Sequence, residues 1–216
     1  MDQQQTGAKA LSRWNARPSF EESPIYVMAD GGDMAAAVAL QHDERPVTPG
    51  PADQETKPMP RRSRTYGTVS ADRQKAMSGL EFVQGLVDGT LPLNTIAEIL
   101  AYDVTEVERG RVAITCEPNG SHLNPAGTVH GGLSATLLDS CMGLAIRSMQ
   151  EKGVSSTTLE FKISLVRPIT PETGLIKAEG VVLNCGRRIG TAEGRITDQQ
   201  GRLLAHGTTT CLVFES

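Results

Sequence analysis

Residues 124–139 read NPAGTVHGGLSATLLD, and this stretch decides the fold. A loop rich in Pro and Gly runs directly into a long apolar segment. From Leu133 to Met149 the sequence contains no Pro, one Gly and a single acid, Asp139, and most of its residues are good helix formers. The pattern predicts a long helix whose first turn is Gly131-Gly132.

The expected helix has two different faces. At about 100° per residue, one broad arc is apolar; it holds Leu133, Leu137, Leu138, Cys141, Leu144 and Ala145. The side that carries Asp139 lacks the long Lys and Glu chains of a solvated face; it holds Gly132, Ala135, Thr136, Gly143 and Ile146. A ligand or another chain could approach closely over such small residues. Asp139 is therefore a candidate active-site residue, the alternatives being an acid in solvent or a helix carboxylate held by one hydrogen bond.

Composition limits the class of protein. The 216 residues fit one domain with extra sequence, or two very small domains. A net charge of -4 gives no reason to expect nucleic acid or an anionic membrane as a partner. No apolar run could cross a bilayer, and the start lacks the features of a secretory signal. The four cysteines are far apart in apolar patterns, which is typical of reduced core thiols, so we expect a soluble cytoplasmic protein.

Residues 1–64 differ in composition from the rest. They contain three consecutive glutamines, five prolines between Pro46 and Pro60, and the basic cluster 61–64. Little apolar surface is present to offset the entropy of ordering this segment. We predict a flexible low-complexity tail over 1–64, or an artefact of an upstream start codon, with the basic cluster as a solvated linker. The folded domain is expected over 65–216.

The remaining elements follow from their patterns. Ser78 and Glu81 form a capping-box signature for a helix that ends at Asp88-Gly89. Strands are expected over 99–107, 111–117, 157–166, 175–183, 188–197 and 202–214. In the third of these, Leu159, Phe161, Ile163 and Leu165 alternate with Thr158, Glu160, Lys162 and Ser164, which predicts two opposite faces. Short turns favour antiparallel neighbours. The sequence thus predicts an α+β fold in which one antiparallel sheet wraps around the apolar arc of the central helix.

This order of elements, with Asn-x5-His-Gly-Gly before the helix and an acid seven residues after the second Gly, resembles the hotdog fold. More narrowly, it resembles the PaaI-type acyl-CoA thioesterases of the phenylacetate pathway. The resemblance covers about residues 78–214, and residues 124–139 carry most of its specificity. Further support comes from TTLEF at 157–161, Arg167-Pro168 and AHGT at 205–208.

The resemblance implies a role for four catalytic positions. Asp139 becomes the catalytic carboxylate, and Gly131 the oxyanion donor through its backbone N–H. Asn124 becomes the amide that orients the thioester or water, and Thr158 matches the hydroxyl position on the strand after the central helix.

Four further positions are expected to contribute to substrate binding. His130 and Gly132 belong to the helix start, where we expect His130 to order the loop. Arg187 and Arg188 lie in a predicted turn beside a glycine and could meet a coenzyme A phosphate, although a solvated hairpin is an equal alternative.

In the resembled family the site lies between two subunits. Asn124 and Gly131 of one chain would then face Asp139 and Thr158 of the other. The resemblance implies a homodimer or a dimer of dimers, that is, a homotetramer. The substrate would be an acyl-CoA, and the resemblance suggests an aryl or arylacetyl group as its acyl part. No separate cofactor and no metal is expected.

These residue types suit thioester hydrolysis. Asp139 can act as a general base on water or attack directly to form an anhydride, and the sequence does not separate the two. Gly131 at a helix start offers an unpaired N–H at the positive end of the helix dipole. A preorganised donor of this kind stabilises a transition state by about 3–4 kcal/mol.

Structural alternatives exist for the supporting residues. Asn124 could bond its own loop backbone, and Thr158 could be an ordinary β-former on an exposed strand face. His122 and His206 are isolated and offer no convincing metal site with the distant cysteines.

Three functions compete. The leading hypothesis is an acyl-CoA thioesterase. The second is a hotdog protein that binds acyl-CoA without turnover, as a regulator or sequestering module; residues 1–64 show no helix-turn-helix pattern that would support a regulator. A hydratase or dehydratase is the third, and it should show a His-led acid/base pair in a different motif.

Overall fold

The computed structural model describes residues 64–215. The tail predicted over 1–64 therefore lies outside the described residues, except for Arg64. The Arg64 side chain is only 7% exposed and pairs with Asp103 over 2.6 Å. It also donates to the backbone oxygens of Leu86 and Val87, in the last turn of a helix, where a cation is favourable. The expectation of a solvated linker is wrong at this residue.

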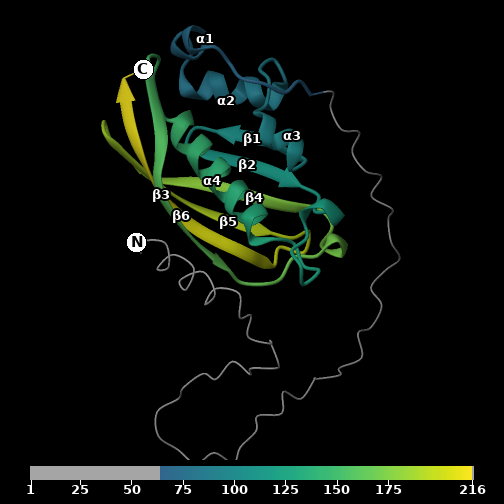
Figure 1. The fold of residues 1–216 in the computed structure, drawn as a ribbon. Helices are drawn as coiled ribbons and strands as arrows, with labels where there is room; N and C mark the ends of the chain where they lie inside the picture. Colours follow the sequence, from purple (N-terminus) through teal and green to yellow (C-terminus); the bar gives the residue numbers. More distant parts are fainter. Residues whose placement is uncertain (1–63, 216) are drawn as a thin grey trace, which may run out of the picture. The chain divides into compact units, whose positions relative to one another are not determined.

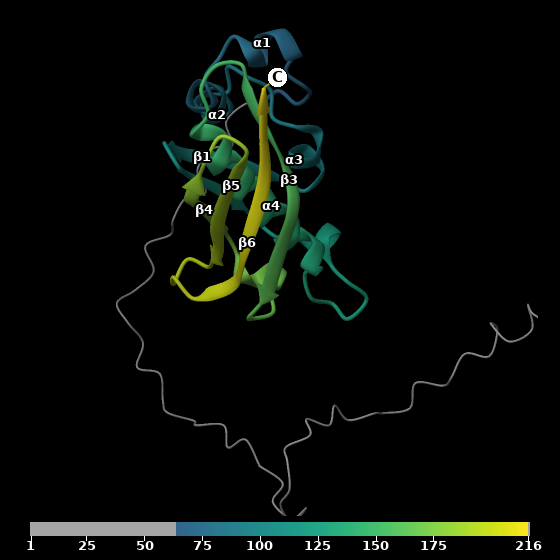
Figure 2. The same cartoon turned by 90° about the vertical axis from the view of Figure 1, so that its left-hand side faces the viewer.

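The described chain contains helices and strands in the expected order. These are α1 (Ala71–Lys75), α2 (Gly79–Asp88), α3 (Thr95–Ile99), β1 (Tyr102–Glu108), β2 (Arg111–Cys116), η1 (Gly120–His122), α4 (Gly131–Ser148), β3 (Val154–Leu165), η2 (Pro171–Thr173), β4 (Ile176–Cys185), β5 (Ile189–Thr197) and β6 (Leu203–Glu215). The sheet order is β1-β2-β4-β5-β6-β3, and every neighbouring pair is antiparallel. In Figure 1 the curved sheet lies behind α4, and in Figure 2 β3 lies beside β6. The predicted α+β architecture is confirmed.

Local sequence signals set the helix boundaries. Ser78 and Glu81 form both hydrogen bonds of the capping box, and Gly89 ends α2 in the left-handed conformation with φ 78°, as expected of a C-terminal glycine. The central helix α4 begins at Gly131, as predicted, and His130 caps it by accepting the Gly132 N–H at its Nδ1. None of the helices between residues 64 and 215 is long and apolar enough to cross a membrane.

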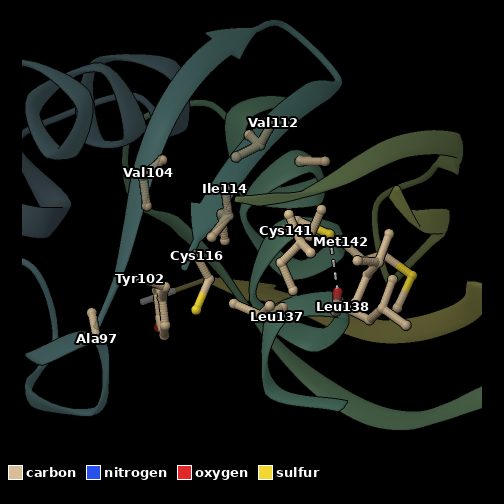
Figure 3. Close-up of a cluster of buried hydrophobic side chains, with 14 of the residues drawn as sticks. Ala97, Tyr102, Val104, Val112, Ile114, Cys116, Leu137, Leu138, Cys141 and Met142 are labelled. Atoms are coloured by element: carbon tan, nitrogen blue, oxygen red, sulfur yellow. Dashed lines mark hydrogen bonds between the residues drawn. The ribbon is translucent and has the colours of Figure 1, made fainter. Parts of the chain in front are cut away.

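The core lies between α4 and the concave face of the sheet. Figure 3 shows side chains of β1 and β2, such as Val104 and Ile114, facing Leu137 and Cys141 of α4. Apart from Arg147 and Ser148 at the end of the helix, the buried positions of α4 are Leu133, Ser134, Leu137, Leu138, Cys141, Met142, Ala145 and Ile146. This is one helical stripe, and because the sheet curves around it the stripe is wider than the predicted arc.

One residue of the helix lies on a different face from the one predicted, and another lies at the boundary between the two faces. Ile146, expected beside Asp139, is fully buried, and its side chain would meet any Cβ placed on Gly190. Leu144, expected in the core, packs against the core cluster and also lines a cavity together with Asp139. The cause is a rotation of the buried stripe, since Met142 packs beneath β5 at Gly194.

A close approach of α4 to the sheet depends on Gly180 in β4. A Cβ at this position would lie 2.5 Å from the backbone carbon and oxygen of Cys141. Only a residue without a side chain lets the helix backbone come so near the strand. The four cysteines, all within the described residues, form no disulfide, and three of them are buried.

The alternation predicted for β3 is interrupted. A β-bulge lies between Thr158 and Glu160, where the pairing with β6 shifts. Thr158 pairs with Cys211, and Phe161 pairs with Thr209. Because Cys211 and Thr209 are two residues apart on β6, they share a face, and their partners share it too. Thr158 and Phe161 therefore lie on the same face, and the prediction of opposite faces is wrong here.

Candidate active site

A cavity of about 400 Å³ lies along the face of α4 that does not enter the core. Its helical wall is Asp139, Ser140, Gly143, Leu144 and Arg147, which is the spacing of one helix face. The opposite walls come from α2, the segment 67–69 and the first half of β3. The small residue Gly143 leaves the space open. A Cβ added at this position would meet Thr158 Oγ1 only at 4.0 Å. The prediction that small residues beside Asp139 leave room for a ligand is consistent with this cavity.

Asp139 and Thr158 meet in this cavity. The Thr158 hydroxyl donates to Asp139 Oδ1 over 2.9 Å, and both residues line the space. The bulge in β3 explains this contact, because it sets the face on which Thr158 lies. Asp139 Oδ2 has no hydrogen-bond partner among the described residues. One carboxylate oxygen is thus held in place, and the other is available to a ligand.

Cys211 lies behind this pair. Its Sγ is 3.9 Å from Thr158 Oγ1, and it also lines the cavity. Burial is the main cause that raises the pKa of the Cys211 thiol, and the nearby charge of Asp139 adds to it. Cys211 is therefore a neutral thiol, which makes it a poor nucleophile.

The opposite wall is fixed by a hydrogen-bond chain that the sequence did not indicate. The Tyr102 hydroxyl lies 3.3 Å from Ser140 Oγ and donates to Asn94 Oδ1 over 3.0 Å. Asn94 is also the N-cap of α3. Ser140 could have been suspected from its place beside Asp139, but Tyr102 and Asn94 reach the cavity only through tertiary packing.

The start of α4 opens onto a different space. A second cavity of about 390 Å³ is lined by His122, His130, Gly132 and Thr136, among others. Gly131, the expected oxyanion donor, precedes Asp139 by eight residues, which is about 12 Å along a helix. No described residue accepts the Gly131 N–H. Within one chain, the expected donor and the expected carboxylate are therefore not brought together.

Asn124 is engaged by its own loop. Its Oδ1 accepts the backbone N–H groups of Ala126 and Thr128, and its Nδ2 donates to Thr128 Oγ1 over 2.8 Å. This is the alternative that the sequence left open, a loop Asn that orders its own turn. The second Nδ2 proton has no acceptor among residues 64–215. The loop therefore presents a fixed amide close to the start of α4.

The two arginines of the predicted phosphate contact lie elsewhere. Arg187 and Arg188 are exposed in the turn between β4 and β5. Neither lines either of the two cavities. The turn lies beyond Gly190, which packs against Ile146 near the end of α4.

The sequence is similar to a known protein family and to individual proteins of that kind. The model of the family described as the thioesterase superfamily matches residues 126–205, which include Gly131, Asp139 and Thr158. The chain is 32% identical over 111 residues to acyl-coenzyme A thioesterase 13 of Mus musculus, covering 50% of this chain and 77% of that protein. It is 39% identical over 69 residues to a Halobacterium salinarum protein that bears an esterase name. That match spans 31% of this chain and only 44% of the relative's length.

Solved structures share the fold. A phenylacetic acid degradation-related protein of Ralstonia eutropha JMP134 is 26% identical, with a TM-score of 0.55, over 61% of this chain and 98% of that one. The PaaI protein of the E. coli phenylacetic acid degradation operon has a TM-score of 0.57 at 20% identity, over 64% and 98% of the two chains. These similarities confirm the predicted hotdog architecture.

Proposed function

This chain belongs to the thioesterase superfamily, and from that premise we propose that it hydrolyses acyl-coenzyme A thioesters to a free acid and coenzyme A. The observation that carries the proposal is the Asp139–Thr158 contact of 2.9 Å at the wall of an open cavity. Both residues fall within the segment that matches the family. Their side chains form a fixed carboxylate with one unpaired oxygen, which is what a hydrolase of this chemistry needs.

The chemistry follows from the unpaired oxygen. As a general base, Asp139 Oδ2 takes a proton from water while the hydroxide adds to the thioester carbon. The C–S bond then breaks, and the leaving thiolate receives a proton to give free coenzyme A. As a nucleophile, the same oxygen would attack the carbon, expel the thiolate and leave an anhydride for water to cleave. In both routes Thr158 holds the other oxygen and so aims the carboxylate.

We propose that the complete site is shared between two copies of the chain. Asn124 and the Gly131 N–H of one protomer would face Asp139 and Thr158 of its partner. Their separation within one chain supports this arrangement, since neither Asn124 nor Gly131 lines the cavity that holds Asp139. So does the edge strand β3, where Leu159, Phe161 and Leu165 are 56%, 40% and 57% exposed. An exposed apolar edge strand is usually covered by another chain.

We make further proposals for the acyl group and for the coenzyme A part of the substrate. The similarity to a phenylacetic acid degradation-related protein supports an aryl or arylacetyl group as the acyl part. Arg187 and Arg188 are exposed and remain proposed contacts of a coenzyme A phosphate, with His130 and Gly132 at the helix start. Four cysteines without a disulfide support a reducing compartment, and the cytoplasm stays the proposed location.

The test separates catalysis from binding. Wild-type protein is incubated with phenylacetyl-, hydroxybenzoyl-, short-chain and medium-chain acyl-CoA, and both the free acid and coenzyme A are quantified by mass spectrometry. We expect equal amounts of the two products from at least one substrate. Tight binding by calorimetry without any product would instead support the non-catalytic acyl-CoA-binding protein.

A further inference from the structure

The cavity that holds Asp139 has a cation at its other end. Arg147 follows Asp139 by eight residues on α4, about 12 Å along the helix, and both line the same space. Gly143 and Leu144 form the floor between them. An acyl group whose thioester carbon reaches Asp139 would therefore extend along this floor towards Arg147.

The Arg147 guanidinium is buried without an acid. The residue is 8% exposed, and burial lowers the pKa of its guanidinium. No carboxylate between residues 64 and 215 lies within 4 Å of it. Its Nη1 donates to Gln150 Oε1, Val154 O and Ser155 Oγ, and its carbon Cζ lies 5.4 Å from the centre of the Phe82 ring. A buried charge without an opposite charge is costly.

Part of this guanidinium is still unused. Arginine has five N–H donors, and within the described chain only Nη1 has acceptors. Gln150, whose Oε1 accepts from Arg147, brings no negative charge and does not line the cavity. This end of the cavity therefore offers the charged donors of Arg147 to a ligand, and no carboxylate of residues 64–215 within 4 Å balances them.

The walls of the cavity are mixed in polarity. Residues 155–158 of β3, all of which carry hydroxyl groups, line it together with Gln74 and Asn94, and so do apolar residues of α2 and β1. Leu144 adds apolar surface between Asp139 and Arg147, and the Phe82 ring lies beside the Arg147 guanidinium. The space thus has apolar surface between its two charged ends.

We propose that the preferred acyl group carries a carboxylate at its far end, held by Arg147, and that Arg147 determines this specificity. The proposal rests on the proposed function, since it takes the thioester carbon to lie at Asp139. A carboxylate matches the planar fork of a guanidinium. The carbon skeleton between the two ends can be aliphatic or aromatic, because Phe82 and Leu144 offer apolar surface that would cover either.

The test compares matched substrate pairs that differ only in the distal carboxylate. One pair is adipyl-CoA and hexanoyl-CoA, and the other is (4-carboxyphenyl)acetyl-CoA and phenylacetyl-CoA. In wild-type protein we expect kcat/KM to favour the carboxylate member by about 10- to 100-fold in at least one pair, the size of a charge-assisted hydrogen bond. In Arg147→Met, which keeps the packing of the stem, the preference should fall to near one, whereas Arg147→Lys should keep part of it.

Arg109→Met is the matched control. Arg109 donates to Met149 O at the same end of α4 but is 53% exposed and does not line the cavity, so its loss should leave the preference unchanged. A purely structural role of Arg147 would lower both members of a pair alike and leave their ratio intact. That result, or a wild-type preference for the alkyl and aryl members, would overturn the proposal while the thioesterase function stands.

A failure of the proposed function gives a different result. If wild type hydrolyses neither these four substrates nor the panel used to test the proposed function, the function is wrong, and the same pairs are compared by calorimetric Kd. Tighter binding of the carboxylate members that is lost in Arg147→Met supports the subsite, and equal binding overturns it. If Arg147→Met does not fold, the proposal is tested by the wild-type protein and by Arg147→Lys. Wild-type kcat/KM ratios that are equal or that favour the member without the carboxylate contradict it. Arg147→Lys, which keeps the charge, should retain part of the preference.

Discussion

At the scale of single residues, the site depends on the hydrogen bond from Thr158 Oγ1 to Asp139 Oδ1. Asp139 is half-buried on α4, and its second oxygen has no partner in the described residues. Without the threonine hydroxyl, the carboxylate could rotate and exchange its oxygens. In the proposed reaction, this fixed orientation positions one oxygen as the base or nucleophile.

Replacing Thr158 tests this orientation. Thr158→Val removes the hydroxyl and keeps the β-branched shape, so the strand should fold unchanged. We expect kcat/KM for the best acyl-CoA to fall about 10- to 100-fold, the size of a hydrogen bond to a charged group. Thr158→Ser, which keeps the hydroxyl, is the control and should retain most activity. Equal rates for wild type and Thr158→Val would show that the contact does not position the carboxylate.

At the scale of elements, the close contact of α4 with β4 holds the cavity wall in place. A Cβ on Gly180 would lie 2.5 Å from the Cys141 backbone, so the strand and the helix are in close contact at this point. Any separation of the two would open a gap in the core. Asp139 is two residues before Cys141 on the same helix. The position of the carboxylate relative to β3 therefore depends on this packing.

Substituting Gly180 should destabilise the domain. Gly180→Ala forces the helix away from the sheet, and we expect a loss of about 1–3 kcal/mol in the free energy of unfolding. Urea denaturation followed by circular dichroism measures this loss. Gly120→Ala is the control, because a Cβ there meets nothing within 4 Å. A Gly180→Ala protein as stable as wild type would mean that the close approach has been misjudged.

Element boundaries could be predicted from the sequence wherever a local signal exists. The capping box at Ser78 and the glycines at the start of α4 act within one turn, so they are visible in the chain itself. The bulge beside Thr158 is not, since it arises from the register of β3 on β6, and strict alternation misplaced Phe161. The same holds for the candidate site. Asp139 can be predicted as a candidate from its isolation on an apolar helix, whereas Tyr102 and Arg147 reach the cavity only through packing.

At the scale of the whole molecule, the proposed site needs two copies of the chain. Gly131 and Asp139 are about 12 Å apart along one helix, and the Asn124 amide is engaged by its own loop. In an isologous dimer, the Gly131 N–H and the Asn124 amide of each protomer would lie near Asp139 of the other protomer, which gives two equivalent sites.

Mixing two inactive variants tests the shared site. Asp139→Asn and Asn124→Ala are each expected to be inactive alone. Co-expressed with different affinity tags, they should form about half mixed dimers. Each mixed dimer has one intact site, so we expect about a quarter of wild-type activity in the mixture. No recovery, with mixed dimers present by tandem purification, would contradict a site built from both protomers.

The most direct measurement of the central claim is the release of coenzyme A by wild type and Asp139→Asn. Both proteins are assayed with a thiol reagent on the best substrate, and Asp88→Asn, a surface acid that accepts from Gln84, is the matched control. The account predicts a loss of at least about 1000-fold in kcat for Asp139→Asn, the scale of a lost catalytic group, with circular dichroism unchanged and Asp88→Asn fully active. A folded Asp139→Asn that releases coenzyme A at the wild-type rate would contradict it.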